Sequence, residues 1–188
     1  MHVSDLMVRG IRTCRPEDTL NDAARLLWEG GCGCLPVVSR DARVVGILTD
    51  RDVCMAAYTQ GRTLKEMQVL SAASDRVVSC APHESLAKAE AIMRQHAVRR
   101  LPVVENGGRI VGILSLNDLA REATRQRAAR RPAVTDAEVG ATLAAICEEH
   151  ASWRSPAAAE EKSVTRPDTL FEPGMFRPRG FIREVSNG

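Results

Sequence analysis

Residues 34–52 read CLPVVSRDARVVGILTDRD, and residues 100–118 read RLPVVENGGRIVGILSLND. The two stretches share Leu-Pro-Val-Val and Val-Gly-Ile-Leu at a constant offset of 66 residues, and both end in aspartate. Without a gap, the match extends over residues 14–57 and 80–123. Identical pairs include Cys14 with Cys80, Pro16 with Pro82, Leu20 with Leu86, Ala23 with Ala89, and Asp52 with Asp118. An internal repeat of this length means that the chain contains two copies of one structural unit.

Each copy predicts the same order of strands and helices. Residues 35–38 and 44–48 are short apolar runs rich in β-branched side chains, which is typical of two buried strands joined by a turn. Residues 19–28 carry apolar side chains at helical spacing, and the second copy repeats this pattern with Glu90 as one polar departure. A further helix follows from Thr49 or Ser115. With a short strand before the helix, the unit is strand, helix, strand, strand, helix.

The repeat therefore predicts an α+β fold in which two units pack sheet against sheet, because one unit of about 50 residues is too small to bury its own sheet face. We expect a first domain at residues 1–62, a linker at 63–75 and a second domain at 76–128. A C-terminal helix is expected at 129–150 and an extended or disordered tail at 151–188. Thr135 is the predicted cap of that helix. Its apolar stripe comprises Val139, Leu143, Ile146 and Cys147.

Composition narrows the possible classes of function. Aromatic residues make up only 3% of the chain, so the core must be mostly aliphatic, and a net charge of +2 is too small a bias to indicate nucleic acid. No apolar stretch reaches the roughly 20 residues that span a bilayer, and no signal peptide is evident, so we expect a cytoplasmic protein without a membrane partner. The six cysteines are then reduced. Cys32-Gly33-Cys34 is too tight for a four-ligand zinc site, and no metal is expected.

The repeated stretches resemble the signature of CBS (cystathionine-β-synthase-type) domains. The resemblance lies in residues 34–38 followed by 46–52, and in residues 100–104 followed by 112–118. Two such domains form a Bateman module, here of the stand-alone bacterial type, whose units are related by a pseudo-twofold axis. The resemblance implies a non-enzymatic regulatory module that binds an adenine nucleotide (AMP, ADP or ATP) or a related adenosyl ligand. It also implies that no cofactor is required and that two modules associate into a flat disc-like homodimer.

The residues at each strand-to-helix turn suit a sugar phosphate. The glycine of each Gly-Ile-Leu run lets the backbone approach a flat ligand, and the hydroxyl of Thr49 or Ser115 can meet a phosphate beside free helix N-terminal amides. The carboxylates of Asp52 and Asp118 lie one helical turn further on and can accept hydrogen bonds from ribose hydroxyls. The same Ser/Thr-x-x-Asp pattern is close to a capping box, whose side chains only satisfy backbone N–H groups. Both interpretations remain open from the sequence.

The resemblance implies that the strand opening one repeat, including Arg12, faces the cleft of the other. The cleft closed by Asp118 is then expected to be lined by Thr13, Cys14, Pro16, Arg99, Arg100, Ile113, Ser115, Asn117 and Asp118. The second cleft is expected to be lined by Cys34, Ile47, Thr49, Arg51, Asp52, Val78, Ser79 and Cys80. Similar modules use basic residues at the positions of Arg99 and Arg100 to reach phosphate, which predicts the more phosphorylated ligand in the cleft of Asp118. Cys14 and Cys80 also fit the alternative of small buried apolar residues.

Other classes of function are compatible with parts of the sequence. A ligand-free module would use the paired repeats only for dimerisation or protein interaction, and the C-terminal helix is a candidate surface for a client protein. No Gly-x-Ser-x-Gly or phosphate-binding Gly-x-x-x-x-Gly-Lys motif is present, so an enzyme is not expected. The arginines at 121, 125, 127, 130 and 131 lack interleaved aromatic residues and complement a helix C-terminus, which argues against nucleic acid as a partner.

Overall fold

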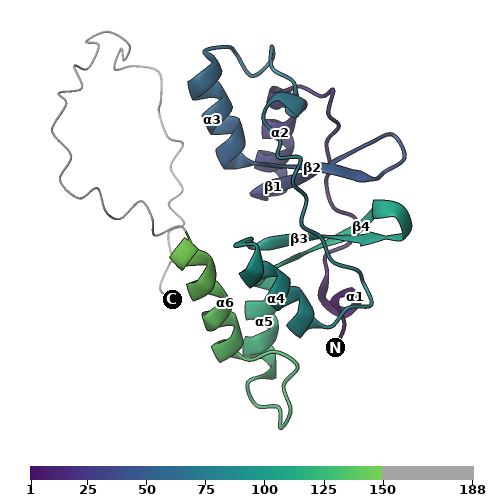
Figure 1. Ribbon diagram of the computed structural model, residues 1–188, viewed down its shortest axis with the longest axis vertical. Helices are drawn as coiled ribbons and strands as arrows, with labels where there is room; N and C mark the ends of the chain where they lie inside the picture. Colours follow the sequence, from purple (N-terminus) through teal and green to yellow (C-terminus); the bar gives the residue numbers. More distant parts are fainter. Residues whose placement is uncertain (150–188) are drawn as a thin grey trace, which may run out of the picture. The chain divides into compact units, whose positions relative to one another are not determined.

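The computed structural model describes residues 1–149, and the tail predicted at 151–188 lies outside the described residues. The described part is α+β, as the repeat predicts (Figure 1). The first repeat contains α2 (Leu20–Gly30), β1 (Cys34–Val38), β2 (Val44–Thr49) and α3 (Asp50–Gln60). The second contains α4 (Leu86–Gln95), β3 (Arg100–Glu105), β4 (Arg109–Ser115) and α5 (Leu116–Gln126). The remaining elements are α1 (Val3–Leu6), the short 3-10 helices η1 (Val69–Ser71) and η2 (Asn106–Gly108), and α6 (Asp136–Glu149).

Each repeat is built on one antiparallel hairpin. Leu35 lies opposite Leu48 in the first hairpin and Leu101 opposite Leu114 in the second, and all four leucines are completely buried. Helices pack on the face of the hairpin that carries these side chains, as α2 and α3 do in the first repeat. The predicted two-strand core of the repeat is thus confirmed.

The strand predicted to open each repeat is shorter than expected. It is reduced to a single parallel bridge between Cys14 and Val37, and the second repeat has the equivalent bridge from Cys80. Proline follows two residues later, at Pro16 and Pro82. Because proline has no N–H to donate, it prevents the ladder from continuing.

The two repeats exchange the segments that precede them. Val8 bridges to Ile113 in β4 of the second repeat, and Ser74 bridges to Ile47 in β2 of the first. A Cβ atom on Gly112 would lie 2.7 Å from the Val8 carbonyl oxygen, and one on Gly46 would lie 3.0 Å from that of Ser74. The glycine of each Gly-Ile-Leu run therefore makes room for a neighbouring backbone, and not for a flat ligand as predicted.

Because of this exchange, the predicted domain boundaries do not coincide with the two hydrophobic cores. Val3 and Met7, predicted to belong to the first domain, lie in the hydrophobic core of the second repeat. Met67 and Val69, predicted to belong to the linker, lie in the core of the first. The core of the second repeat thus takes apolar side chains from the N-terminal segment, and the core of the first takes them from the segment that follows α3. Main-chain pairing joins the two repeats.

Helix α6 packs on α4 and α5 of the second repeat (Figure 1). Its predicted cap is confirmed, since Glu138 N donates to Thr135 Oγ1 at 3.2 Å. The predicted apolar stripe is partly wrong, because Ile146 is buried and Val139 packs on the core, whereas Leu143 and Cys147 are exposed. Thr142 and Val134 are buried instead. Within residues 1–149, no helix is long and apolar enough to cross a membrane.

Candidate functional site

A pocket of about 470 Å³ lies between the repeats, and we call it the Asp118 pocket. Three segments form it: the chain before the first repeat, the loop from α2 to β1, and the junction of β4 and α5. The lining residues are Val8, Gly10, Ile11, Arg12, Gly30, Gly31, Cys32, Gly33, Cys34, Pro36, Arg100, Ile113, Ser115, Asn117, Asp118 and Arg121. Its volume falls in the range of about 300–1,000 Å³ that is usual for small-molecule sites.

The β4–α5 junction places Ser115 and Asp118 in a capping box. Asp118 N donates to Ser115 Oγ at 3.3 Å, while Ser115 N and Oγ donate to Asp118 Oδ2 at 2.9 Å and 2.5 Å. The other carboxylate oxygen, Oδ1, accepts a hydrogen bond from Arg121 Nη2 at 2.6 Å. Both oxygens of this buried carboxylate are therefore already engaged, and a ribose hydroxyl would compete with Arg121 for Oδ1.

Thr49 and Asp52 form the equivalent box at the start of α3. Asp52 N donates to Thr49 Oγ1 at 3.2 Å, and Thr49 N and Oγ1 donate to Asp52 Oδ2 at 2.8 Å and 2.7 Å. The capping interpretation of both Ser/Thr-x-x-Asp pairs is thus confirmed. Capping leaves room for a ligand role, because a carboxylate has about four acceptor positions.

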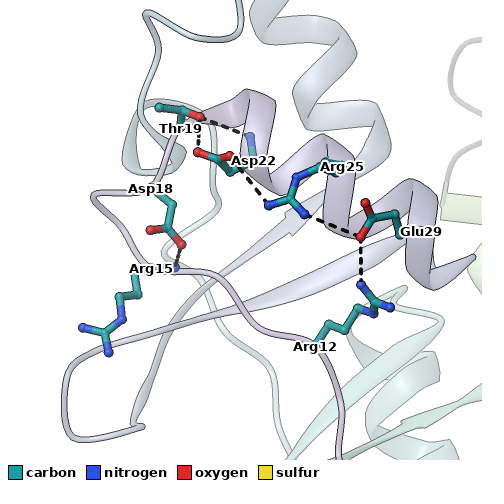
Figure 2. A network of polar contacts seen from close by, with 7 residues as sticks. All are labelled: Arg12, Arg15, Asp18, Thr19, Asp22, Arg25 and Glu29. Carbon is teal, nitrogen blue, oxygen red and sulfur yellow. Dashed lines mark hydrogen bonds and ion pairs between the residues drawn. The ribbon is translucent and has the colours of Figure 1, made fainter.

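The rim of the Asp118 pocket carries basic side chains. Arg12 is held at 3.4 Å by Glu29, which also contacts Arg25 at 3.6 Å, and Figure 2 shows this chain of contacts running along α2. These exposed ion pairs are individually weak, so Arg12 can turn toward a ligand at little cost. Arg100 extends over Gly33, where a Cβ atom would lie 3.0 Å from its Nη2. Within residues 1–149, Arg100 forms no ion pair.

The loop from α2 to β1 shapes one wall. Gly31 ends α2 in the left-handed region, with φ at +55°, which glycine adopts without strain. A Cβ atom on Gly30 would lie 3.0 Å from Arg12 Cδ and 3.1 Å from Cys32 Sγ, so the loop packs closely against these side chains. Burial raises the pKa of the Cys34 thiol, against the lowering effect of the nearby Arg100 charge. Cys34 is therefore a neutral, apolar part of the wall.

A second, smaller cavity of about 210 Å³ shares Cys34, Arg100 and Ile113 with the Asp118 pocket, and we call it the Thr49 pocket. It is lined by Cys34, Ile47, Thr49, Val98, Arg99, Arg100, Pro102 and Ile113. Arg99 thus faces Thr49 and not Asp118, contrary to the prediction, whereas Arg100 borders both pockets. The repeat explains this, because the residues that precede Leu-Pro-Val-Val in one repeat face the strand-to-helix turn of the other.

The structure brings together part of the predicted site. Arg100, Ile113, Ser115, Asn117 and Asp118 meet in the Asp118 pocket. Ile47, Thr49 and Cys34 meet in the Thr49 pocket, and Cys34 borders both. The residues predicted as walls that line neither pocket are Thr13, Cys14, Pro16, Arg51, Asp52, Val78, Ser79 and Cys80.

Cys14 and Cys80 are the clearest of these differences. Both lie in the hydrophobic cores, and burial raises the pKa of each thiol to about 12. A thiol in such surroundings stays protonated and packs as a small apolar residue. The alternative considered for these two positions from the sequence therefore fits the structure.

Sequence reasoning missed several lining residues. The sequence places Arg121 in a run of arginines near a helix C-terminus, whereas the structure shows it one turn beyond Asp118 and bonded to it. The sequence does not predict the loop at 30–33 as a wall, because its glycines have no counterpart in the second repeat. The glycine-rich composition of that loop was the signal that could have identified it.

The chain consists of a tandem pair of α+β repeats. These repeats exchange their leading segments and enclose pockets between them, and this arrangement defines the class of the protein. The CBS domain model matches residues 3–58 and 68–125. The chain therefore belongs to the CBS-domain family, which confirms the resemblance in the sequence.

Two relatives differ in how much of their own length matches this chain. The CBS domain-containing protein YhcV of Bacillus subtilis is 38% identical over 118 residues, which are 63% of this chain and 82% of YhcV. The homoserine O-acetyltransferase of Methanohalobium evestigatum is 29% identical over 120 residues, but these are only 24% of that enzyme. Because the match covers so little of that enzyme, it carries no catalytic activity over to this chain.

Solved structures share the fold. AcuB of Vibrio cholerae superposes with a TM-score of 0.62 at 27% identity and covers 70% of this chain and 98% of AcuB. CBSX2 in complex with AMP superposes with a TM-score of 0.60 at 24% identity. This match covers 67% of this chain and 98% of CBSX2. The third structure is the CBS domain pair of MJ0100 in complex with 5-methylthioadenosine and S-adenosyl-L-methionine. It superposes with a TM-score of 0.57 at 24% identity, and the match covers 64% of this chain and 94% of that pair. At such identities the last two establish the fold alone.

The described residues offer no cluster for a metal ion. In residues 1–149, no group of three or more histidine, cysteine, aspartate or glutamate side chains lies in an arrangement that could hold one. The Asp118 pocket presents guanidinium groups, one carboxylate, a hydroxyl, an amide, two thiols and an apolar wall.

Proposed function

We propose that this protein is a regulatory module that binds a phosphorylated adenine nucleotide in the Asp118 pocket. One observation carries the proposal: the start of α5, with Ser115 and Asp118, lines the same cavity of about 470 Å³ as Arg100 and Arg12. A helix N-terminus and guanidinium groups both attract phosphate. The apolar side chains of Val8 and Ile113 supply a surface for a flat base.

The charges of the pocket favour an anionic ligand. Arg12, Arg100 and Arg121 line it together with a single carboxylate, that of Asp118. AMP, ADP or ATP would complement this excess of positive charge, whereas the sulfonium of S-adenosylmethionine would add to it. The AMP complex of CBSX2 and the adenosyl complexes of MJ0100 support adenosyl ligands as a class. The charge of this pocket is what favours the phosphorylated members.

The Thr49 pocket is the weaker candidate for a ligand site. Its volume of about 210 Å³ lies below the usual range for small-molecule sites. If only one pocket is filled, we expect the Asp118 pocket to be that one. In that case Arg99 and Arg100 would bind only a small anion or a fragment of a nucleotide in the Thr49 pocket.

A ligand-free module remains the alternative, and the closed capping boxes at Thr49 and Ser115 favour it. Melting of the purified protein with millimolar AMP, ATP, methylthioadenosine and S-adenosylmethionine separates the two. A ligand at one hundred times its Kd adds about 2.7 kcal/mol of stability, so a bound nucleotide gives a clear rise in Tm. We expect a rise with AMP or ATP that Asp118→Ala abolishes. No rise with any of the four, or a rise with S-adenosylmethionine alone, contradicts the proposal.

A cytoplasmic location and self-association are part of the same proposal.

A further inference from the structure

A groove lies along α2 and α3, which are neighbours in the first repeat (Figure 1), and we call it the α2–α3 groove. It has a volume of about 630 Å³. Leu27 and Val53 are buried apolar residues of its wall, and Trp28 lines it with 88% of its surface exposed. Its charged lining residues are Asp50 and Arg100. An apolar wall with an aromatic ring and a few polar groups is typical of a small-molecule site.

The α2–α3 groove and the Asp118 pocket share one wall, which consists of the loop at 31–33 and Arg100. This loop has little bulk, since a Cβ atom on Gly31 would have nothing within 4 Å. A Cβ atom on Gly33 would lie 3.0 Å from Arg100 Nη2 and 3.4 Å from Asp50 Oδ2, so these two side chains flank the same glycine. An extended ligand can therefore lie across the loop, with Arg100 near its middle.

The features of the groove are specific to the first repeat. At the offset of 66, Trp28 corresponds to Arg94 and Asp50 to Leu116. The loop corresponds to residues 97–99, which read Ala-Val-Arg and have side chains in place of both glycines. In the second repeat α6 also packs on both helices, α4 and α5. The fold of the repeat therefore does not require the tryptophan, the carboxylate or the glycines, and a ligand gives each of them a role.

The order of chemical groups along the two cavities suits two nucleosides joined through phosphates. In the proposed function the Asp118 pocket holds an adenosine, and the guanidinium of Arg100 binds phosphate. The carboxylate of Asp50, beside Gly33, can accept hydrogen bonds from the hydroxyls of a second ribose. The indole of Trp28 offers a face on which any base can stack, because every base has a π-face. A mononucleotide would leave Asp50 and Trp28 unused.

We infer that the α2–α3 groove binds the second nucleoside of a pyrophosphate-linked dinucleotide whose first nucleoside lies in the Asp118 pocket. The second base stacks on Trp28, and Arg100 binds the phosphates between the two nucleosides. This inference rests on the proposed function. It extends that function from adenine mononucleotides to dinucleotides.

Titration calorimetry with NAD⁺, diadenosine diphosphate and ADP-ribose tests the inference on the full chain. ADP-ribose is the matched ligand, because it has the adenosine, the pyrophosphate and the second ribose but lacks the second base. We expect at least one dinucleotide to bind about tenfold more tightly than ADP-ribose, a factor within the range for stacking of a base on an aromatic side chain. Trp28→Ala should remove this advantage and leave the Kd of AMP unchanged.

Tyr58→Ala is the matched control, because Tyr58 is an aromatic residue of α3 with 83% exposure that does not line the groove. It should keep the full advantage of the dinucleotide. Fluorescence gives an independent readout, since the chain has two tryptophans, Trp28 and Trp153. In Trp153→Phe the bound dinucleotide should quench the fluorescence of Trp28, whereas AMP should not.

Circular dichroism and Tm establish that each variant is folded. The inference is overturned if neither dinucleotide binds more tightly than ADP-ribose, or if folded Trp28→Ala keeps the advantage. Loss of the advantage in Tyr58→Ala also overturns it. The titration with AMP separates this result from the proposed function. Saturable binding of AMP without a dinucleotide advantage overturns this inference alone, whereas no binding of AMP or of either dinucleotide overturns both.

Discussion

Arg121 donates from Nη2 to Oδ1 of Asp118 at 2.6 Å, across one turn of α5. The carboxylate is buried and the arginine side chain is 77% exposed, so Arg121 covers the one oxygen of Asp118 that the capping box does not use. A ribose that binds Asp118 must displace this bond or share it. The pair thus connects the folding of α5 with the proposed ligand site.

Replacing Arg121 with alanine should change ligand preference. Adenosine should bind up to about fivefold more tightly, because it no longer breaks a partly exposed ion pair worth about 1 kcal/mol at most. AMP should gain less or lose affinity, since a cation that faces the pocket is removed. Isothermal titration calorimetry of both ligands measures this change. Arg127→Ala, which removes a surface arginine paired with Asp136, is the control. An unchanged ratio of the two Kd values contradicts the role given to Arg121.

Gly112→Ala should destabilise the fold by about 1–3 kcal/mol, the usual cost of overpacking. The added methyl group would lie 2.7 Å from the Val8 carbonyl oxygen, and a backbone atom cannot easily move aside. Gly140→Ala is the matched control, because nothing lies within 4 Å of its Cβ position on α6. It should stabilise by about 0.5–1 kcal/mol through helix propensity. Urea unfolding measures both. Equal effects of the two substitutions would show that the exchanged segment does not require glycine.

Glu90 should make stability depend on pH. Burial chiefly raises the pKa of this carboxyl, Glu138 raises it further and Arg94 opposes both, while Glu90 Oε1 has no hydrogen-bond partner in residues 1–149. An acid whose pKa is higher in the folded than in the unfolded state binds more protons when folded. Its contribution to stability therefore falls as pH rises through the interval between the unfolded and the folded pKa.

Glu90→Gln should accordingly stabilise the protein at pH 7.5 by about 1 kcal/mol, by removing a buried charge. The advantage over the natural chain should be smaller at pH 5, because the raised pKa of Glu90 favours its protonation on acidification. Denaturant unfolding at both pH values gives the difference. Glu148→Gln, an exposed position on α6, should show neither effect. An advantage of Glu90→Gln that grows on acidification would contradict this assignment.

The fold could be predicted because the repeat carries it. Leu35 and Leu48 lie in short apolar runs of the kind that form buried strands, and the hydroxyls of Thr49 and Ser115 mark helix starts by local hydrogen bonding. Such features depend only on neighbours in the chain. The strand that opens each repeat is shorter than predicted, because a short-range pattern does not show how far a ladder extends before Pro16.

The site could be predicted only in part, since its walls depend on contacts between distant segments. Gly112 and Gly46 are glycine because the exchanged segments at Val8 and Ser74 lie directly against them. No local sequence pattern reveals this exchange. Cys14 fits a pocket wall or a core equally well by size and polarity. The direction of its side chain is set by the pairing with Val37.

The central claim is that the Asp118 pocket binds a phosphorylated adenine nucleotide through Arg100. Titration calorimetry of AMP into the natural chain and into Arg100→Ala tests it most directly, with Arg40→Ala on the exposed hairpin turn as control. We predict saturable binding by the natural chain and by Arg40→Ala, and at least tenfold weaker binding by Arg100→Ala, the loss expected for a charged hydrogen bond. Absence of binding by the natural chain at millimolar AMP, or equal affinity of all three proteins, would contradict the claim.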